Sequence, residues 1–519
     1  MSIGLYRWPA RRFRIWVIVV SLTLPSFLGA QTQSRNDFGK TPDFSSVRTL
    51  IREQMAATDT PSMAVAVVRG KEILWEDGFG FIDHPVGTPT TPNTAFYCAS
   101  VTKTITATAL MILAERKQLD FDRPANEYLT EAKLTSPHWN ATEATVRRIA
   151  THTAGLTTFN RAYVQGGKQE RIPFAEIIRR YGIVFWPPGD SFDYSNLGYG
   201  ILGEIVANVS KRSFGDFLKE EIFRPLGMEH SSLWVTPGQP TAPRYNSYLK
   251  AVSPPIESAV PGASSVYSSV HDLALFGMFH LQTRPPGQRS ILTSAGIEQL
   301  VSPTVDAGGG DRHSLAWSVK DDQNGYRTLL AQGGTSDSQA WLLLVPAEKI
   351  AVVVLGNCGN TPAPRVIDEI LSTLLPPYKT NLENRAKYAA SRPTPTPTPA
   401  TPSPPAAEMI GTWVGKVQTY KSDVPLTFKI SPAGEVEATL AQNSTLKLTN
   451  LRFKGLRMSG KMVADLGVSD TDGGTYELQF YLRRYEDRMM GAATTAALPG
   501  SVTQSLSFWV ELTRRVVVP

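Results

Sequence analysis

The sequence predicts an α+β domain, in which helices flank an antiparallel sheet and form a lobe beside it, followed by a small all-β barrel. Three observations predict this fold. Apolar strand patterns lie near both ends of the first 378 residues, with helix-like segments between them. A Pro/Thr-rich stretch then interrupts the chain, and strict alternation of apolar and polar residues follows it.

The first domain opens with a helix-like stretch, Phe44 to Thr58, and two strands, Met63 to Val68 and Glu72 to Phe81, which the turn Arg69-Gly70-Lys71 joins. Further helices are expected at Thr145 to Ala150, Phe174 to Arg180, Leu197 to Val209, Phe214 to Glu221 and Arg365 to Leu374. Late apolar strands are expected at Thr328 to Gln332, Ala340 to Val345 and Ile350 to Leu355. Strands at both ends favour a sheet closed by the two ends of the domain over a doubly wound parallel sheet.

Composition shifts divide the chain into five parts. Residues 1–30 read as a signal peptide, with four arginines, an apolar run and small residues ending at Ala30. An N-terminal tail, 31–44, precedes the first domain, 45–378. A Pro/Thr-rich linker, 379–407, leads to the barrel, 408–519. Export to the periplasm or the medium is therefore expected, and an uncleaved membrane anchor is the alternative.

Charge and cysteine content exclude several classes of function. Removing the four leader arginines from the net charge of +6 leaves +2, so the mature chain offers no case for nucleic-acid binding. The two cysteines, Cys98 and Cys358, allow no disulfide framework and no cysteine-based zinc site. Two buried free thiols are expected, and one disulfide is the alternative. The seven histidines form no His-x-x-x-His pair, and no metal is predicted.

The stretch Phe96 to Ala114 has the pattern of a buried helix, apolar nearly all round. Its one charged residue, Lys103, stands three places after Ser100, which lies at the helix start. On a helix this spacing lets the ammonium return over the hydroxyl. A lysine without a carboxylate in an apolar site is costly, which indicates a function. The alternative is a capped core helix whose lysine reaches solvent.

Tyr194-Ser195-Asn196 leads into a later helix. In an extended segment, residues two apart point the same way, so the Tyr194 phenol and the Asn196 amide are expected to face one pocket. A phenol beside an ammonium is a candidate to accept the proton of Ser100. The alternative is that Asn196 caps its helix and Tyr194 is core.

Gln332-Gly333-Gly334-Thr335 ends a late apolar strand. Paired glycines allow another backbone or a substrate to approach closely. A backbone N–H near Thr335, together with that of Ser100, would form an oxyanion hole. A glycine bulge at a strand end is the alternative.

A run of motifs in order resembles the class C β-lactamase and penicillin-recognising serine hydrolase family, which also holds D-alanyl-D-alanine carboxypeptidases and small esterases. The resemblance covers residues 45–376. The segments that carry it are Pro61 to Asp83, Phe96 to Lys103, Thr151 to Leu156, Pro187 to Gly203, Arg224 to Met228, Ser268 to Ala274 and the late Gly-Gly strand.

The resemblance implies a role for each candidate residue. Ser100 would be the acylated nucleophile, Lys103 its activating partner and Tyr194 the general base. Asn196 would bind a substrate amide, and Gln332 to Thr335 would edge the pocket. Such chemistry needs no metal or organic cofactor.

The chain departs from the pattern of the family it resembles at Gln332, where relatives usually carry Lys or His. Glutamine keeps hydrogen bonds but not the charge, which argues against strong binding of penicillin-like or D-alanine carboxylates. We therefore expect an exported serine hydrolase that acts through an acyl-enzyme on ester, amide or β-lactam carbonyls, rather than a dedicated β-lactamase. Its expected substrate is a small-molecule or peptidoglycan-derived compound. A D-alanyl-D-alanine carboxypeptidase, a true class C β-lactamase and a catalytically weak binding module are the alternatives. An α/β-hydrolase would need Gly-x-Ser-x-Gly, which the chain lacks.

The tail alternates with period two, as in Leu426, Phe428 and Ile430, which predicts about eight half-buried antiparallel strands. A closed, lipocalin-like barrel is expected. Trp413 lies between two glycines, Gly411 and Gly415, near the start of the barrel domain. It is interpreted as a plug of the barrel at least as readily as part of a ligand site. No catalytic role is assigned to the barrel.

Overall fold

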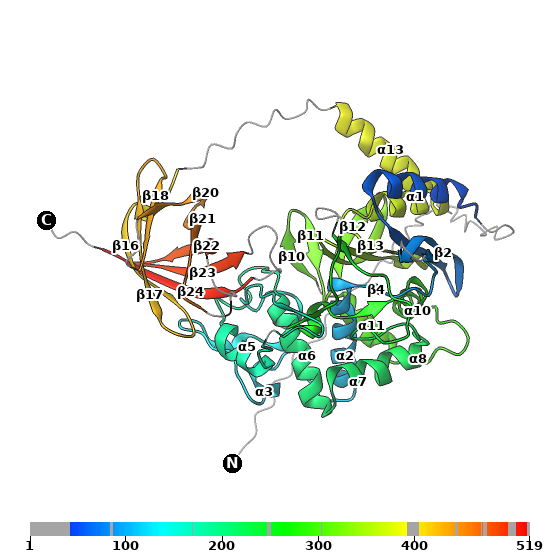
Figure 1. Ribbon diagram of the computed structural model, residues 1–519, viewed down its shortest axis with the longest axis horizontal. Coiled ribbons are helices and arrows are strands. Elements are labelled where there is room, and N and C mark those ends of the chain that lie inside the picture. Colours follow the sequence, from blue (N-terminus) through cyan, green and yellow to red (C-terminus); the bar gives the residue numbers. More distant parts are fainter. Residues whose placement is uncertain are drawn as a thin grey trace, which may run out of the picture. The chain divides into compact units, whose positions relative to one another are not determined.

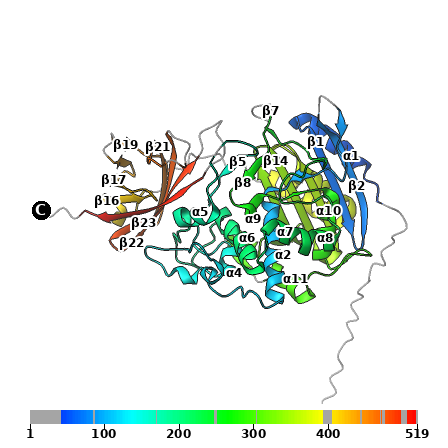
Figure 2. The same ribbon diagram turned by 60° about the horizontal axis from the view of Figure 1, so that its bottom comes forward.

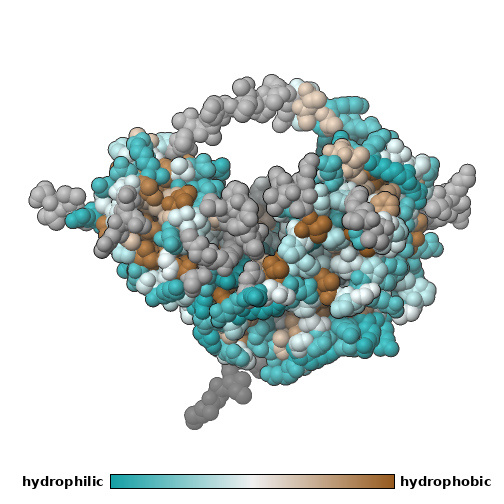
Figure 3. Space-filling model, viewed as in Figure 1, coloured by the Kyte–Doolittle hydropathy of each residue, from teal (hydrophilic) through white to brown (hydrophobic). Residues whose placement is uncertain are grey.

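The computed structural model describes residues 42–83, 87–168, 170–246, 251–302, 304–391, 404–441, 445–468, 470, 475–496 and 505–515. The expected signal peptide and all but the last three residues of the expected tail lie outside these ranges. Within them, each helix is too short or too polar to cross a bilayer. On the face shown in Figure 3, the visible hydrophobic residues form small separate groups among hydrophilic ones.

The first sheet is antiparallel, with the strand order β10-β11-β12-β13-β14-β15-β1-β2-β3. Its strands are β1 (Ser62–Arg69), β2 (Glu72–Asp83), β3 (Thr88–Pro89), β10 (Val305–Gly308), β11 (Asp311–His313), β12 (Ser318–Gln323), β13 (Tyr326–Thr335), β14 (Ser338–Val345) and β15 (Ile350–Gly356). Met63 in β1 pairs with Gly356 in β15. The prediction that early and late strands close one sheet is confirmed.

Helices cover both faces of this sheet, because its central strands are apolar on both sides. In β1, Val65 packs in one cluster with α1 (Ser45–Thr58) and α12 (Ala363–Leu374). Its neighbour Ala66 packs on the other side in a cluster with α10 (Val270–His280). Alternate residues of one strand therefore serve two cores. Figure 1 shows α1 and α10 on either side of the sheet.

The helical lobe is built around α2 (Thr102–Glu115), which contacts α6 (Asn196–Ser210), α9 (Pro261–Ser264) and α11 (Ser294–Val301). Figure 2 shows α2, α6 and α9 side by side. Twelve consecutive residues of α2, from Thr102 to Leu113, are buried, as its all-round apolar pattern predicts. The remaining helices are α3 (Ala125–Tyr128), α4 (Val146–Ala150), α5 (Phe174–Tyr181), α7 (Phe214–Leu218) and α8 (Arg224–Leu226).

One boundary predicted from the sequence is wrong. The expected linker begins at residue 379, but α13 (Pro376–Ser391) continues as helix through its first thirteen positions. These positions hold Lys, Leu, Glu, Arg and Ala and no Pro or Gly, so they favour helix. Tyr378 is buried, and α13 packs on α12. Of the Pro/Thr-rich stretch, residues 393–405, all but the last two positions lie outside the described residues.

The second sheet is antiparallel, nearly closed and barrel-like, with the strand order β19-β18-β17-β16-β24-β23-β22-β21-β20. Only Leu448 separates the two outermost strands in the chain, which brings the two edges of the sheet together. Trp413 is fully buried, and its indole N–H donates to the carbonyl of Met409 over 2.8 Å. The strands are β16 (Gly411–Gln418), β17 (Asp423–Ile430), β18 (Val436–Leu440), β19 (Leu446–Lys447), β20 (Thr449–Lys454), β21 (Arg457–Ala464), β22 (Tyr476–Tyr485), β23 (Arg488–Ala496) and β24 (Ser507–Arg514).

Candidate active site

Ser100 lies in a single 3-10 turn, Ala99–Val101, which leads directly into α2. Strand β13 presses against this turn at Gly333. A Cβ atom at Gly333 would overlap the Cys98 carbonyl oxygen and lie 2.7 Å from the Ser100 nitrogen. The close approach expected of the glycine pair therefore occurs at Gly333, and it holds the Ser100 backbone against the strand.

Lys103 is 3% exposed and reaches back to Ser100 as the helical spacing predicts. Its Nζ donates to Ser100 Oγ over 2.9 Å, to Asn196 Oδ1 over 2.7 Å and to the carbonyl of Ala263 over 3.0 Å. Three acceptors thus surround the amine, and none of these is a carboxylate. Burial lowers the pKa of Lys103, although the nearby Tyr194 opposes this shift.

Tyr194 completes the contacts of the hydroxyl at Ser100. Its phenol donates to Ser100 Oγ over 2.8 Å, and Lys103 Nζ lies 4.8 Å from the centre of its ring. The side chain is 42% exposed, so the phenol faces open space as well as the hydroxyl. An amine and a phenol therefore both donate to one serine oxygen.

Ser195, not Asn196, caps α6, because its hydroxyl accepts from the Gly198 nitrogen over 3.0 Å. This leaves the Asn196 amide free for the site. Its Oδ1 accepts from Lys103, and its Nδ2 donates to Asn160 Oδ1 over 2.6 Å. The structure thus brings Ser100, Lys103, Tyr194 and Asn196 together.

Gln332 lies outside this group, which corrects the expectation that it edges the pocket. Side chains alternate along β13, so when Gly333 faces Ser100 its neighbour turns to the other face of the sheet. There Gln332 lines a separate hollow with Trp341 and Asp368. Gly334 and Thr335 do line the hollow at Ser100, where the Thr335 hydroxyl donates to Asp337 over 2.6 Å.

The hollow at Ser100 measures about 470 Å³ and is walled on one side by a buried ion pair. Arg244 and Asp337 are 6% and 8% exposed and approach to 3.1 Å. Arg161, the other cation among the lining residues, donates to the Asp470 carbonyl over 2.7 Å and lies 4.0 Å from its carboxylate. Both guanidinium groups in this hollow therefore have an acidic partner.

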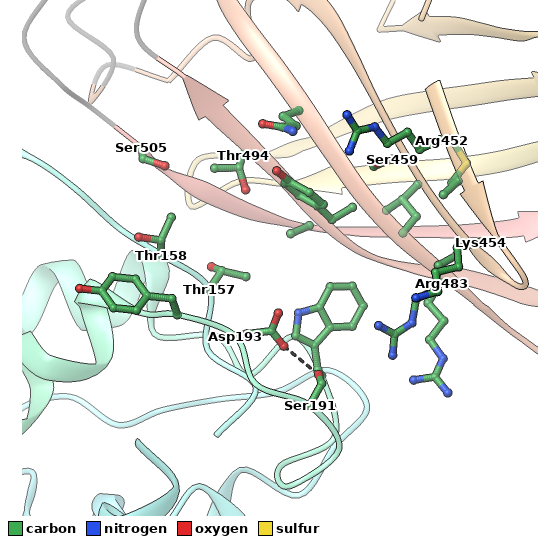
Figure 4. Close-up of a pocket in the computed structure, with 18 of the residues that line it drawn as sticks. Thr157, Thr158, Ser191, Asp193, Arg452, Lys454, Ser459, Arg483, Thr494 and Ser505 are labelled. Carbon is green, nitrogen blue, oxygen red and sulfur yellow. Dashed lines mark hydrogen bonds between the residues drawn. The ribbon is translucent and has the colours of Figure 1, made fainter. Parts of the chain in front are cut away.

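A second hollow, of about 530 Å³, opens on the Tyr194 side of the site. Figure 4 shows Thr157, Thr158 and Asp193 on one wall, opposite Arg452 and Lys454 of the barrel. Its remaining lining residues include Trp186, Tyr481 and Leu482. Tyr194 borders this hollow, and its phenol bonds to Ser100, which lines the first hollow.

A sequence profile of the β-lactamase family matches residues 47–375, more than half of the chain. The chain belongs to the β-lactamase family. Among curated members, the unguisins hydrolase of Aspergillus campestris is 28% identical over 413 residues, which cover 72% of this chain and 75% of that protein.

Solved structures place both parts of this β-lactamase-family chain in a known architecture. The octameric penicillin-binding protein homologue from Pyrococcus abyssi aligns with a TM-score of 0.57 and 20% identity, over 90% of this chain and 100% of that one. An alignment of that extent includes the barrel. A class C beta-lactamase from Rhodobacter sphaeroides aligns with a TM-score of 0.53 and 20% identity, over 66% of this chain and 99% of that one.

Sequence reasoning missed three residues beside the site of this family member. The His152 ring is tilted against its neighbours, with its centre 4.5 Å from that of Tyr194 and 5.2 Å from that of His313, and its Nδ1 accepts from the Ser195 nitrogen. Burial lowers the pKa of His313 to about 4 and that of His152 well below its usual value. Asn160, the partner of Asn196, is the third. His152 stands in a segment that the family resemblance already marks, whereas no local pattern marks Asn160 or His313.

Within the described ranges, no three His, Cys, Asp or Glu side chains lie together so as to hold a metal ion. Cys98 and Cys358 are both buried free thiols. Burial raises the pKa of Cys98, so its thiol stays protonated at neutral pH.

Proposed function

We propose that this β-lactamase-family protein is a serine hydrolase that acts through an acyl-enzyme formed on Ser100. One observation carries the proposal: Lys103 Nζ and Tyr194 Oη approach the same Ser100 Oγ, at 2.9 and 2.8 Å. Of these two groups the amine is buried, whereas the tyrosine side chain is 42% exposed. The arrangement suits attack on ester, amide or β-lactam carbonyls.

These contacts support the following reaction. Tyr194, aided by the Lys103 amine that receives its phenol proton, takes the Ser100 proton while Oγ bonds to the substrate carbonyl carbon. Tyr194 then gives that proton to the leaving group as its bond to the carbon breaks. Water attacks the resulting ester, passes a proton to Tyr194 and releases the acid, and Ser100 regains its proton. The N–H groups of Ser100 and Thr335 are the proposed oxyanion hole.

The charges around Ser100 favour a neutral group at the reacting carbonyl. Arg161 and Arg244 already have acidic partners, and Gln332 faces the other side of the sheet. A substrate carboxylate therefore gains little in this hollow. These contacts support an ester or amide substrate over a penicillin or a D-alanyl-D-alanine peptide. The same acyl-enzyme reaction would act on all four kinds of substrate.

The second hollow supports a substrate with a bulky arm. It is lined by Trp186, Tyr481 and Leu482, and it borders Tyr194, which serves the leaving group in the proposed reaction. Small-molecule or peptidoglycan-derived compounds of this size are the proposed substrates. Secretion, directed by residues 1–30, is part of the same proposal.

Turnover assays test this function directly. Wild-type protein should hydrolyse p-nitrophenyl acetate, and nitrocefin more slowly. Ser100→Ala should lose both activities. Equal rates for wild type and Ser100→Ala would instead favour a binding module that has kept the fold without the chemistry.

A further inference from the structure

The segment Thr157 to Arg161 lies between the active site and the barrel. Its Asn160 forms a two-way main-chain pair with Ser505 of the barrel, in which each nitrogen donates to the other residue's carbonyl over 2.9 Å. Two residues earlier, the carbonyl of Thr158 accepts from the Ser507 hydroxyl over 3.2 Å. The backbone of this segment is therefore held by the start of strand β24.

The side chain of the same Asn160 faces the catalytic group. It accepts from Asn196 Nδ2 over 2.6 Å, Asn196 accepts from Lys103 over 2.7 Å, and Lys103 donates to Ser100 over 2.9 Å. Asn196 thus turns its oxygen to the Lys103 amine and its nitrogen to the Asn160 oxygen, so each end of its amide has one partner. Loss of the Asn160 acceptor would leave this half-buried nitrogen without the partner that fixes the amide.

A second anchor lies one residue further along. Arg161 donates to the Asp470 carbonyl, and the carboxylate of Asp470, 5% exposed, accepts from both Arg180 and Tyr181. The bonds from Arg180 measure 2.7 and 2.8 Å and reach both oxygens, a bidentate geometry that is among the stronger polar contacts in proteins. Thus the barrel holds the segment on both sides of the Asn160 side chain.

We propose that Asn160 is a positioning residue through which the barrel fixes the Asn196–Lys103 arm of the active site. This inference rests on the proposed function, because it concerns how the nucleophile is kept in place. The barrel then contributes to acylation without touching the reacting atoms. Losing the contacts between the barrel and Asn160 should therefore slow the reaction of Ser100, even with a probe too small to reach the barrel.

A pair of substitutions at Ser505 tests the main-chain link. Ser505→Ala keeps the N–H that bonds to Asn160, whereas Ser505→Pro removes it. The second-order rate constant for labelling of Ser100 by a small fluorophosphonate should change less than twofold in Ser505→Ala and fall roughly tenfold in Ser505→Pro, as expected for a slightly misplaced catalytic group. A folded Ser505→Pro protein that labels as fast as wild type would overturn the proposal.

Substitutions at Asn160 test the side-chain link and serve if Ser505→Pro does not fold. Asn160→Ala should lower labelling roughly tenfold, and Asn160→Asp, which keeps an acceptor oxygen, should recover most of it. Asp470→Asn perturbs the second anchor and should also slow labelling. In the Asn160→Ala background, Ser505→Pro or Asp470→Asn should add little further loss, because both act through the same side chain.

Three results would contradict this inference: effects that multiply in the double variants, equal losses in Asn160→Asp and Asn160→Ala, or no loss in Asn160→Ala. Thermal unfolding of each variant checks that the fold persists. Failure of wild-type protein to label at Ser100 would refute the proposed function instead, so the two ideas fail on different observations.

Discussion

At the scale of residues, the site depends on close contacts between groups that are otherwise costly to bury. Lys103 sits in an apolar helix without a carboxylate, and its amine is satisfied by one hydroxyl, one side-chain amide and one backbone carbonyl. Such an arrangement is stable only while all three acceptors stay in place. The spacing of Ser100 and Lys103 made their contact predictable, but the third partner, Ala263, lies 160 residues away and leaves no trace in the sequence.

Lys103→Ala should lower the Ser100 labelling rate by about two to four orders of magnitude, the usual effect of losing a proton-transfer group. It should also leave Asn196 Oδ1 and the Ala263 carbonyl without their donor. Stopped-flow or gel-based labelling measures the rate. Lys416→Ala, which removes an exposed lysine paired with Asp423 in the barrel, is the matched control and should label like wild type. A Lys103→Ala protein that labels normally would remove the amine from the mechanism.

Gly333→Ala should abolish labelling, since its Cβ would overlap the Cys98 carbonyl oxygen and push on the Ser100 nitrogen. Neighbouring Gly334→Ala is the control. There the new Cβ would meet the Gln339 side chain at 2.9 Å, and a flexible side chain gives way more easily than backbone. Comparable labelling rates for the two variants would show that strand β13 does not set the position of Ser100.

At the scale of elements, the strands that the sequence predicted best are the continuous apolar runs near the two ends of the first domain. β1 and β15 were predictable because each is buried over nearly its whole length. Two errors have one cause, the limit of local patterns. The apolar pattern placed Gln332 on a strand but could not show which face of that strand meets Ser100. The linker was predicted to start too early, because the Pro-rich repeat follows directly after the helix-forming residues of α13.

Helix α10 (Val270–His280) was not predicted as a helix, and its last residue is a buried histidine. Both ring nitrogens of His280 lack a hydrogen-bond partner among the described residues, and the ring packs against Phe276 and Trp317. Burial lowers the pKa of His280 to about 3, against about 6.5 when unfolded. Between these values the unfolded chain binds a proton that the folded chain does not, so stability falls as the pH is lowered from 6.5.

His280→Phe should therefore reduce the loss of stability on acidification. Between pH 7 and pH 4, the free energy of unfolding falls in both proteins. The fall should be smaller in the variant, by on the order of 3 kcal/mol. Urea unfolding at both pH values measures the difference. The same loss in both proteins would mean that the His280 ring is protonated in the fold.

At the scale of the whole molecule, the barrel and the lobe share buried contacts as well as a chain. Phe185 of the lobe packs in one apolar cluster with Met490 and Trp509 of the barrel. His138 approaches Glu511 to 3.1 Å, and Arg180 binds the buried Asp470. The sequence indicated no catalytic role for the barrel and none of these contacts, because contacts between distant segments leave no periodic pattern.

Cutting the chain within residues 392–403 should leave its two parts associated. A protease site introduced there should yield two fragments that elute together in size-exclusion chromatography at micromolar concentration. The Ser100 labelling rate should stay unchanged, because the contacts at Asn160 and Asp470 do not depend on the linker. Fragments that separate under these conditions would mean that the interface is too weak to position the active site.

Labelling and peptide mapping give the most direct test of the central claim, that Ser100 is the nucleophile held by Lys103 and Tyr194. Wild-type protein is treated with a fluorophosphonate or a penicillin probe, digested and analysed by mass spectrometry. The account predicts one labelled serine, Ser100, and no label in Ser100→Ala. A label on any other residue, or an unlabelled wild-type protein, would contradict it.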